Sequence, residues 1–233
     1  MKGKISGVSL GPGEPELITL KALKALQEAD IIYCPGTQAK SRSRDILQAL
    51  PINMERVRLF HVPMSKDRTL ANQAYDTICT EIATLVATGK NVAITAEGDS
   101  GFYSSMNYMF DKLASMNLPV TSIAGVPAFI AAGAISGLHI VKQEEKLIVL
   151  PGIVTAEELA SLLTRGHVVV IMKLSQCTDE IHRFMQANRQ HEFHYYENVG
   201  TINELHSINY KDIIQKAYPY FSLMIIRPGK QLA

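Results

Sequence analysis

The fold of this chain is decided by residues 8–36, which read VSLGPGEPELITLKALKALQEADIIYCPG. The apolar run at residues 5–10 predicts a strand, and the Gly-Pro-Gly sequence after it predicts a tight turn. Leucines at positions 17, 20, 23 and 26 recur with the period of a helix, and residues 31–33 form a short apolar strand. A strand, a turn, a helix and a second strand in this order are typical of an α/β fold.

The same alternation continues along the rest of the chain. In the first half we predict a long amphipathic helix at residues 69–88, a strand at 91–96 and a helix over 102–113. The second half repeats this logic with strands at 120–123, 146–150, 167–172, 191–196 and 220–226, and helices at 128–135, 156–163 and 178–187. Alternating strands and helices predict parallel strands joined by crossover helices. Because Pro119 blocks the continuation of a helix, we expect two α/β domains with a break near residue 116. A single larger sheet is the alternative.

Composition and charge narrow the classes of function. The 233 residues are 47% hydrophobic and 19% charged, so the chain can bury a substantial core and is not globally disordered. The formal net charge of +1 argues against a general nucleic-acid binder, which usually carries a basic excess. Three widely separated cysteines, Cys34, Cys79 and Cys177, fit unpaired thiols in a reducing compartment.

One uncharged stretch, between Lys112 and Lys142, is long enough to raise the question of a membrane span. Pro119, Pro127 and Gly133 divide it into strand, turn and helix, so a buried segment of an α/β core explains it better. The first residues lack the apolar stretch and cleavage site of a signal peptide. We therefore expect a cytoplasmic protein with neither a membrane nor a nucleic acid as partner.

Three loops in the first part of the chain join a predicted strand to a predicted helix. They read GPGEPEL at residues 11–17, AEGDSGFYSS at 96–105 and AGVPAF at 124–129. Loops at the carboxyl ends of strands are where open α/β sheets bind ligands, and glycines let the backbone approach a ligand closely. The alternatives are a helix cap at Asp99 or Ser100 and ordinary turns elsewhere. The spacing of Gly7, Gly11 and Gly13 is not the GxGxxG of dinucleotide-binding folds, which disfavours a nicotinamide-dependent oxidoreductase.

Two further loops, MKLS at 172–175 and YYENVGT at 195–201, follow predicted strands in the second half. Met172 could pack on an adenine or a thioether, or it could simply be a core residue. No metal or nucleophile signature accompanies these loops. His191 and His194 are three apart on a predicted strand and therefore point to opposite faces, and no HExxH or GxSxG sequence is present. We expect no bound metal.

The order and placement of these five loops closely resemble the tetrapyrrole methylases of corrin biosynthesis. The match covers residues 8–36, then EGDSGFYS, GVPAF, MKLS and ENVGT. This sequence departs from the family pattern at Ser100 and Ala124, where the family commonly has proline. The resemblance implies two α/β domains with the active site in the cleft between them, residues 1–116 on the tetrapyrrole side and 117–233 on the cofactor side. It also implies S-adenosylmethionine as the cofactor, with S-adenosylhomocysteine as product, and a homodimer.

Within this family, HVPMSKD at residues 61–67, GFYSSMNYMF at 101–110 and the spacing from Ile140 to LIVLPG look like the branch that methylates C(20) of a corrin precursor. The resemblance implies transfer of a methyl group to C(20) of precorrin-2 or of cobalt-factor II in cobalamin biosynthesis. The alternatives are a family member that acts at another corrin carbon, on RNA or on protein. The near-zero charge and the lack of an aromatic-basic stripe argue against RNA.

The resemblance also assigns candidate site residues. Those expected at the cofactor are Pro12, Gly98, Asp99, Ser100, Tyr103, Gly125, Val126, Pro127, Met172, Asn198, Val199, Ser222, Leu223 and Met224. The substrate carries several carboxylates, so cations should meet it, and arginine suits a carboxylate because its planar fork makes two parallel hydrogen bonds. The residues expected at the substrate are Gly11, Gly13, Lys40, Arg42, Arg44, Lys66 and Arg68. Tyr103 is the candidate catalytic residue, with a half-buried core tyrosine as the alternative, and a solvated helix start is the alternative for each basic cluster.

Overall fold

The opening segment folds as strand, turn, helix and strand. In the computed structural model, which describes residues 2–63 and 69–229, β1 (Ile5–Ser9) leads through a 3-10 turn to α1 (Leu20–Glu28) and then to β2 (Ile31–Pro35). The helix begins at Leu20 rather than Leu17 because Thr19 caps it, its Oγ1 accepting from the Ala22 N–H at 3.2 Å.

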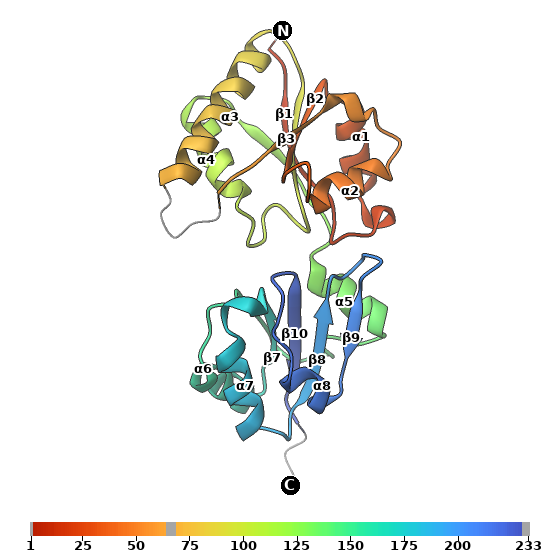
Figure 1. The fold of residues 1–233 in the computed structure, drawn as a ribbon, viewed down its shortest axis with the longest axis vertical. Helices are drawn as coiled ribbons and strands as arrows, with labels where there is room; N and C mark the ends of the chain where they lie inside the picture. Colours follow the sequence, from red (N-terminus) through yellow and green to blue (C-terminus); the bar gives the residue numbers. More distant parts are fainter. Residues whose placement is uncertain (1, 64–68, 230–233) are drawn as a thin grey trace. The chain divides into compact units, whose positions relative to one another are not determined.

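The chain divides into two units, Met1–Pro127 and Ala128–Ala233. The first contains, besides the elements already named, η1 (Pro15–Leu17), α2 (Arg42–Gln48), η2 (Met54–Arg56), β3 (Val57–Phe60), α3 (Thr69–Ala87), β4 (Val92–Ala96), α4 (Met106–Ser115) and β5 (Val120–Ile123) (Figure 1). The second contains α5 (Ala128–Ser136), β6 (Leu147–Leu150), α6 (Ala156–Thr164), β7 (Val168–Met172), η3 (Leu174–Gln176), α7 (Thr178–Ala187), β8 (Glu192–Glu197), β9 (Leu205–Ser207), α8 (Tyr210–Ile214) and β10 (Ser222–Arg227).

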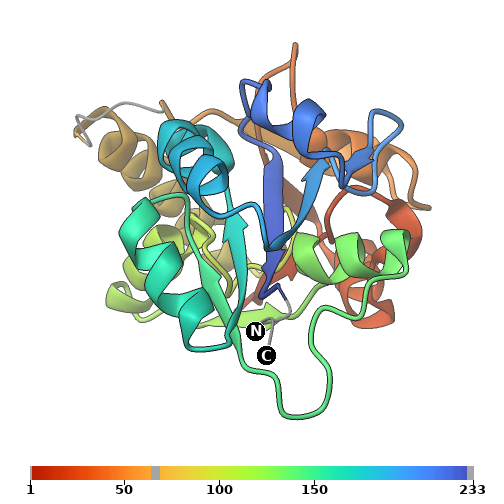
Figure 2. The ribbon, with the colours of Figure 1, turned by 90° about the horizontal axis from the view of Figure 1, so that it is seen from below.

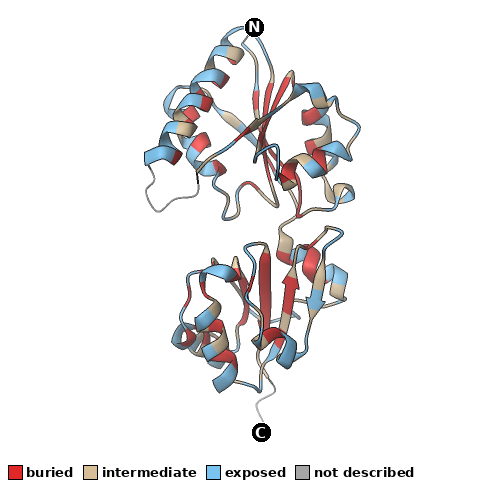
Figure 3. Cartoon of the chain, viewed as in Figure 1, coloured by how far each residue is buried: buried red, intermediate tan, exposed pale blue. Residues whose placement is uncertain are grey.

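The first unit is a parallel sheet between two layers of helices. The strand order is β3-β2-β4-β1-β5, and every neighbouring pair is parallel. One face of the sheet packs against α3 and α4, and the other packs against α1 and α2. Buried residues therefore concentrate on the strands and on the inner faces of the helices (Figure 3). This unit confirms the predicted α/β class with parallel strands.

All five strands of the first unit end at the same edge of their sheet, because they are parallel. The neighbours β1 and β4 are followed by helices that cover opposite faces, α1 on one and α4 on the other. The chain diverges beyond the ends of these two strands, which is where open α/β sheets bind ligands.

The second unit has a mixed sheet, in the order β6-β7-β10-β8-β9. Only β6 and β7 are parallel; β10 runs antiparallel to both β7 and β8, and β9 runs antiparallel to β8. The prediction of parallel strands throughout is therefore wrong for this unit. Helices α6, α7 and α8 pack on one face of its sheet, with α6 and α7 side by side (Figure 2). On the other face lies α5, where the Ser136 and Tyr196 hydroxyls are 2.7 Å apart.

Because β10 runs antiparallel to its neighbours, the loops after β7 and β8 and the loop before β10 lie at the same edge of the second unit's sheet. Because β7 and β8 both run opposite to β10, their carboxyl ends lie beside the start of β10. The register pairs Met172 with Leu223 and Glu197 with Ser222. Three loops that are distant in sequence are thus brought to one edge of the sheet.

The division between the units comes after Pro127, eleven residues later than the predicted break near residue 116. The reason is β5, which follows that break but pairs with β1, so it completes the sheet of the first unit. The helix predicted to start at Phe102 starts at Met106, since Tyr103 has φ 49° and interrupts it. Among the α-helices and strands of the described residues, α2, β3, β9 and α8 are not in the predicted set. Among the described residues, no helix is both long and apolar enough to cross a membrane.

Candidate functional site

The loops after β1 and β4 are bound to each other at the edge of the first unit's sheet. The Gly11 N–H donates to the Gly98 carbonyl at 3.1 Å, and the Gly98 N–H donates to the Gly11 carbonyl at 2.7 Å. Next to this pair, the Ser100 N–H donates to Ser9 Oγ at 2.8 Å, and the two serine hydroxyls are 3.1 Å apart. The loops after β1 and β4, two of the candidate binding loops, are therefore joined directly by hydrogen bonds.

Asp99 joins the loop after β4 to the loop after β5. Its Oδ1 accepts from the Gly101 N–H at 2.8 Å, and its Oδ2 accepts from the Gly125 N–H at 2.7 Å. Charge-assisted hydrogen bonds of this kind are stronger than bonds between neutral groups. The alternative in which Asp99 or Ser100 caps the next helix is wrong, because α4 begins only at Met106. The carboxylate instead holds two neighbouring loops together.

Two glycines in these loops are required by geometry. A Cβ on Gly125 would lie 2.5 Å from the Gly98 carbonyl oxygen and 2.5 Å from Ser9 Cβ, so a side chain there would force the loops apart. Gly98 has φ +65° and a Cβ there would meet nothing within 4 Å. The missing side chain leaves room for a ligand to approach the backbone at Gly98.

Tyr103 lies beside a pocket of about 340 Å³. The pocket is lined from the β4–α4 loop, α4 and β5 by residues that include Ser100, Tyr103, Asn107, Asp111 and Ser122. Tyr103 is 42% exposed, and its backbone φ of 49° is uncommon for a residue with a side chain. Tyr103 lines this pocket with its side chain partly in solvent, and it stays the candidate residue of this part of the unit.

The basic segment at residues 40–44 covers the end of the loop after β2 and the first turn of α2, at the same edge as the loops above. Lys40 is exposed. Arg44 donates from Nη1 to the Gln38 carbonyl at 3.0 Å, which ties it to its own loop. Arg42 is partly buried, and burial lowers the pKa of its guanidinium. Lys66 and Arg68, the other predicted substrate contacts, lie outside the described residues.

Glu97 is a residue of this edge that sequence reasoning missed. It directly follows β4, the central strand, whose five residues are all buried. Ser43 Oγ donates to Glu97 Oε1 at 3.1 Å. Burial raises the pKa of the Glu97 carboxyl, while the positive charge of Arg42 and the bond from Ser43 act in the opposite direction. An acidic residue at the end of a wholly buried central strand is the signal that could have found it.

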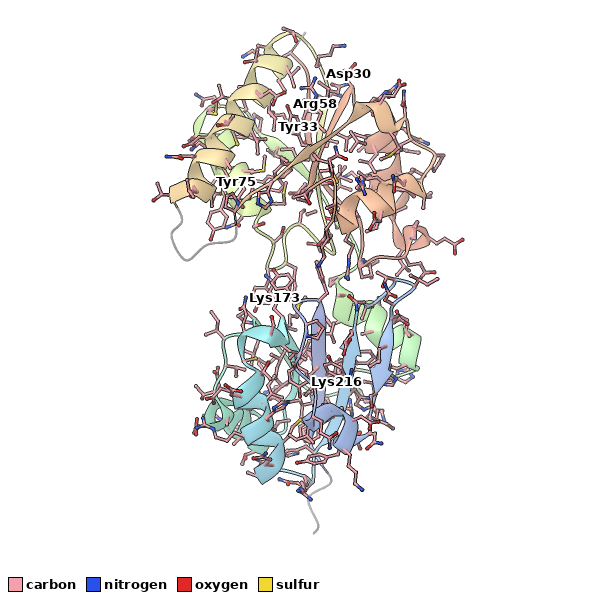
Figure 4. The ribbon with its side chains drawn as sticks, viewed as in Figure 1. Asp30, Tyr33, Arg58, Tyr75, Lys173 and Lys216 are labelled. Atoms are coloured by element: carbon pink, nitrogen blue, oxygen red, sulfur yellow. The ribbon has the colours of Figure 1, made fainter. Side chains whose placement is uncertain are left out.

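The edge of the second unit is closed by two backbone hydrogen bonds. The Lys173 N–H donates to the Ser222 carbonyl at 3.0 Å, and the Asn198 N–H donates to the Phe221 carbonyl at 2.9 Å. Lys173 and Asn198 have φ of 61° and 49°, so the chain turns sharply after β7 and after β8. The Lys173 ammonium lies 5.8 Å from the centre of the Tyr220 ring. Figure 4 labels Lys173 at this edge of the second unit.

Glu197, the last residue of β8, accepts two side-chain hydrogen bonds just before the turn at Asn198. Lys216 donates from Nζ to Glu197 Oε1 at 2.8 Å, and the Tyr195 hydroxyl donates to the same oxygen at 2.6 Å. Burial opposes ionisation of Glu197, but these two bonds outweigh it and lower the pKa of the carboxyl. These two bonds hold the turn at Asn198 in place.

The predicted cofactor residues of this second unit differ in what they offer. Met224 is fully buried and packs in the core against α6 and α7, so its side chain is not available to a ligand. Ser222 is also buried, and its Oγ donates to the Pro219 carbonyl at 2.5 Å. Leu223 and Val199 are buried too, whereas Met172 is only partly buried. The groups that this edge can offer to a ligand are therefore mainly backbone groups.

The structure brings the predicted residues into two sets. In the first unit, the residues that share the edge are Gly11, Pro12, Gly13, Gly98, Asp99, Ser100, Gly125, Val126 and Pro127, with Tyr103 next to Ser100 in the pocket. In the second unit, the set is Met172, Asn198, Val199, Ser222, Leu223 and Met224. Within the described part of the chain, no group of three or more His, Cys, Asp or Glu side chains could hold a metal ion.

The chain has an α/β unit with interlocked glycine loops at the carboxyl edge of a parallel sheet, where open α/β sheets bind small molecules, followed by a second unit with a mixed sheet. Comparison with known sequences gives the family. The model of the tetrapyrrole (corrin/porphyrin) methylases matches residues 4–208, and the chain belongs to that family.

Individual relatives and structures agree with this assignment. The precorrin-2 C(20)-methyltransferase of Sinorhizobium sp is 31% identical to this chain, and the match covers 97% of this chain and 96% of that protein. The cobalt-precorrin-2 C(20)-methyltransferase of Salmonella typhimurium is 26% identical over 75% of this chain and 74% of that protein. The uroporphyrin-III C-methyl transferase of Thermus thermophilus, solved in complex with S-adenosyl homocysteine, has the same fold, with a TM-score of 0.68 at 18% identity over 98% of both chains.

Proposed function

We propose that this protein transfers the methyl group of S-adenosylmethionine to C(20) of precorrin-2 or of cobalt-factor II, in cobalamin biosynthesis. The observation that carries the proposal is the 31% identity to a precorrin-2 C(20)-methyltransferase over nearly the whole of both chains. The second C(20)-methyltransferase relative, which is named for a cobalt-containing substrate, supports the same carbon.

We propose that the two sets of loops bind S-adenosylmethionine. In the first unit this role falls to the backbone around Gly98 and Gly125, with Asp99 holding the loops and Pro12 and Ser100 beside them. In the second unit it falls to Met172, to Asn198 and Val199, and to the backbone of Ser222, Leu223 and Met224. Exposed backbone N–H and C=O groups can read the edge of an adenine, and carbonyl dipoles tolerate a positive sulfur.

Bound S-adenosylmethionine supplies a methyl group on a positively charged sulfur. The task left to the chain is to hold the substrate carbon in line behind that methyl, about 3–3.5 Å away, because positioning can supply much of the rate. We assign the holding of the macrocycle to Tyr103, and the holding of its carboxylates to Lys40, Arg42 and Arg44, with Gly11 and Gly13 at the same edge. We also propose that the protein acts in the cytoplasm as a homodimer.

The test is to supply ¹³C-methyl-labelled S-adenosylmethionine with precorrin-2 and, separately, with cobalt-factor II, and to follow both products by mass spectrometry and ¹³C NMR. We expect one methyl group to be gained, at C(20). A label at a different corrin carbon would refute the assigned position, and no gain with either substrate would refute the substrate. Calorimetry with S-adenosylhomocysteine and with NAD tests the cofactor separately, since binding of NAD alone would end the methylase assignment.

A further inference from the structure

The second unit contains a pocket away from its candidate cofactor loops. Its volume is about 360 Å³, which is within the range of small-molecule sites. It is lined by the segment before β8, the first residues of that strand and the segment that leads from β9 into α8, and its lining includes Arg189, His191, Phe193, His194, Ile208 and Tyr210. Because β8 runs from this pocket to the turn at Asn198, the pocket and the candidate cofactor loops lie at opposite ends of one strand.

The pocket exists because β9 is shorter than β8. The three residues of β9 pair with residues 195–197, the second half of β8. Within the described residues, the first half of β8 therefore has a paired strand, β10, on one side only. After Ser207 the chain leaves the sheet and enters α8, which Asn209 caps by accepting from the Lys211 N–H at 3.1 Å. The pocket occupies the place where a longer β9 would continue.

Arg189 gives the pocket a positive charge. Its guanidinium carbon lies 4.9 Å from the centre of the Tyr210 ring, a cation–π contact that holds the side chain at the pocket. In the part of the chain that the structure describes, Arg189 makes neither an ion pair nor a hydrogen bond. Glu192, the acid of the lining, lies 3.9 Å from Arg227 Nε, so its charge is opposed within the protein.

His191 adds a hydrogen-bond donor. Its Nδ1 accepts from the Gly229 N–H at 2.9 Å, so in the neutral ring the proton is on Nε2, which is then a donor. The Gln190 amide nitrogen, 3.5 Å from Nε2, is itself a donor and does not accept that proton. The ring stacks on Phe184 with centroids 5.9 Å apart, which fixes its plane. The donor is therefore held in one orientation at the pocket.

The remaining walls are apolar. Phe193 is 6% exposed and contributes a ring that belongs to the core, whereas Ile208 is 66% exposed although it lines the pocket. Covering an exposed isoleucine with an apolar ring is favourable, and an aromatic ligand can also stack against Tyr210. The pocket thus combines apolar walls with one guanidinium and one imidazole N–H.

We propose that this pocket binds a small planar aromatic acid, with the ring against Tyr210 and Ile208 and the carboxylate on Arg189. The guanidinium fork makes two parallel hydrogen bonds to a carboxylate. Burial lowers the pKa of both His191 and His194, so their neutral forms are favoured and the lining carries one full positive charge, that of Arg189. One positive charge matches a carboxylate better than a phosphate dianion. The site is separate from methyl transfer and does not depend on the proposed function.

The experiment is calorimetry of the intact protein with indole-3-carboxylate, with excess S-adenosylhomocysteine present to fill the cofactor site. Two matched probes separate the parts of the ligand. Indole-3-carboxamide keeps the ring and loses the charge, whereas cyclohexanecarboxylate keeps the charge and loses the planar ring. We expect indole-3-carboxylate to bind with a Kd below about 1 mM and each matched probe to bind at least about tenfold more weakly. No binding of indole-3-carboxylate, or equal binding of either matched probe, would overturn the proposal.

A pair of arginine variants tests the residue that receives the carboxylate. Arg189→Ala should raise the Kd for indole-3-carboxylate by at least about tenfold, because it removes charge-assisted hydrogen bonds. Arg183→Ala is the matched control, since it removes the same charge from α7 at a residue paired with Glu157 and Glu180, and it should leave the Kd within about twofold. An unchanged Kd in Arg189→Ala, or an equal rise in both variants, would refute a site built on Arg189.

A measurement on the wild type covers the case in which Arg189→Ala does not fold. In ¹H–¹⁵N spectra, indole-3-carboxylate should shift the amide signals of residues 189–194 and 208–210. Shifts confined to residues 96–105, 172–176 or 198–201 would place the probe at the candidate cofactor loops and overturn the proposal. Failure of the proposed function is recognised separately, because methyl transfer by the wild type is measured without any of these probes.

Discussion

Replacing Gly98 with alanine should weaken the binding of S-adenosylhomocysteine while the chain still folds. Gly98 has φ +65°, and a Cβ built there meets no heavy atom within 4 Å. The added methyl group would therefore stand in open space beside the Gly11–Gly98 pair. That space is where we propose the cofactor lies.

Two separate effects are expected of Gly98→Ala, a loss of stability and a loss of affinity for the cofactor. The left-handed conformation costs a residue with a Cβ about 1–2 kcal/mol, and for a chain of this size each kcal/mol lowers the Tm by about 2–4 °C. This term affects folding only. If the cofactor lies against the backbone at Gly98, the methyl group displaces it, and a loss of about 1.4 kcal/mol already corresponds to a tenfold rise in Kd. We expect the Kd to rise by at least about tenfold.

A matched control separates the two terms. Gly166 also lies in the left-handed region, with φ +79°, and a Cβ there also meets nothing within 4 Å. It precedes β7, at the opposite end of that strand from Met172. Gly166→Ala should therefore show a similar loss of Tm with no change in Kd. Calorimetry with S-adenosylhomocysteine and thermal unfolding of both variants are the measurements.

The result that would refute the reasoning is equally specific. If Gly98→Ala binds S-adenosylhomocysteine as tightly as wild type, the cofactor does not approach the backbone at Gly98. If both variants lose affinity to the same extent, the loss reflects strain in the fold and says nothing about the site.

Three more predictions follow from single side chains. Asp99→Asn places an amide N–H₂ group against one of the two backbone N–H groups that the carboxylate binds. We therefore expect the free energy of unfolding, measured in urea, to fall by about 1–3 kcal/mol and the binding of S-adenosylhomocysteine to weaken. An unchanged urea midpoint would contradict the loop-joining role of Asp99. Tyr103→Phe keeps the ring; a kcat within about twofold of wild type would indicate that the ring packs on the macrocycle, whereas a fall of about tenfold or more would indicate that the hydroxyl is needed. Burial, aided by the charge of His206, lowers the pKa of His194 below the usual value of about 6.5 for a histidine, so the neutral form is favoured in the fold and stability falls as the pH drops below about 6.5. His194→Gln should lose less stability than wild type between about pH 7 and pH 5, and identical slopes would contradict this.

The parts of the fold that were predictable are those with a strong local pattern. The strand at residues 120–123 and the helix at 178–187 match β5 and α7 at both ends. Pro119 marks the start of the first segment, and Ile181, Phe184 and Met185 give the second the hydrophobic period of a helix. The division after Pro127 was not predictable in the same way, because it depends on which strand β5 pairs with.

The direction of β10 illustrates what local sequence does not contain. A buried strand such as SLMIIR reads the same whether its neighbours are parallel or antiparallel, since both of its faces are covered. The strand β9 has three residues and the helix α8 has five, too few to show a period. The helix α2 was not predicted because residues 40–44 at its start are all polar and show no hydrophobic period, although the helix buries Ser43, Ile46 and Leu47.

The candidate site shows the same limit at the level of single residues. Sequence reasoning placed Asp99 in the right loop but left open a helix cap, because the acceptor geometry of a carboxylate is not visible in a motif. It assigned Met224 to the cofactor by its position, although strand alternation points that side chain into the core. It missed Glu97, whose hydrogen-bond partner Ser43 lies more than fifty residues earlier in the chain.

The loops of the first unit are held together by hydrogen bonds within the protein itself, and this has a consequence for function. Ser9 fixes Ser100, Gly11 fixes Gly98, and Asp99 fixes Gly125, so three segments from different parts of the chain form one connected network. A network of this kind resists local adjustment, because moving one loop breaks bonds in the next. Methyl transfer depends on alignment more than on an acid or a base, and a preorganised backbone supplies alignment at little entropic cost at the moment of binding. Conservative changes at Ser9 and Asp99 should therefore affect cofactor affinity in a coupled, non-additive way, even where neither side chain touches the ligand.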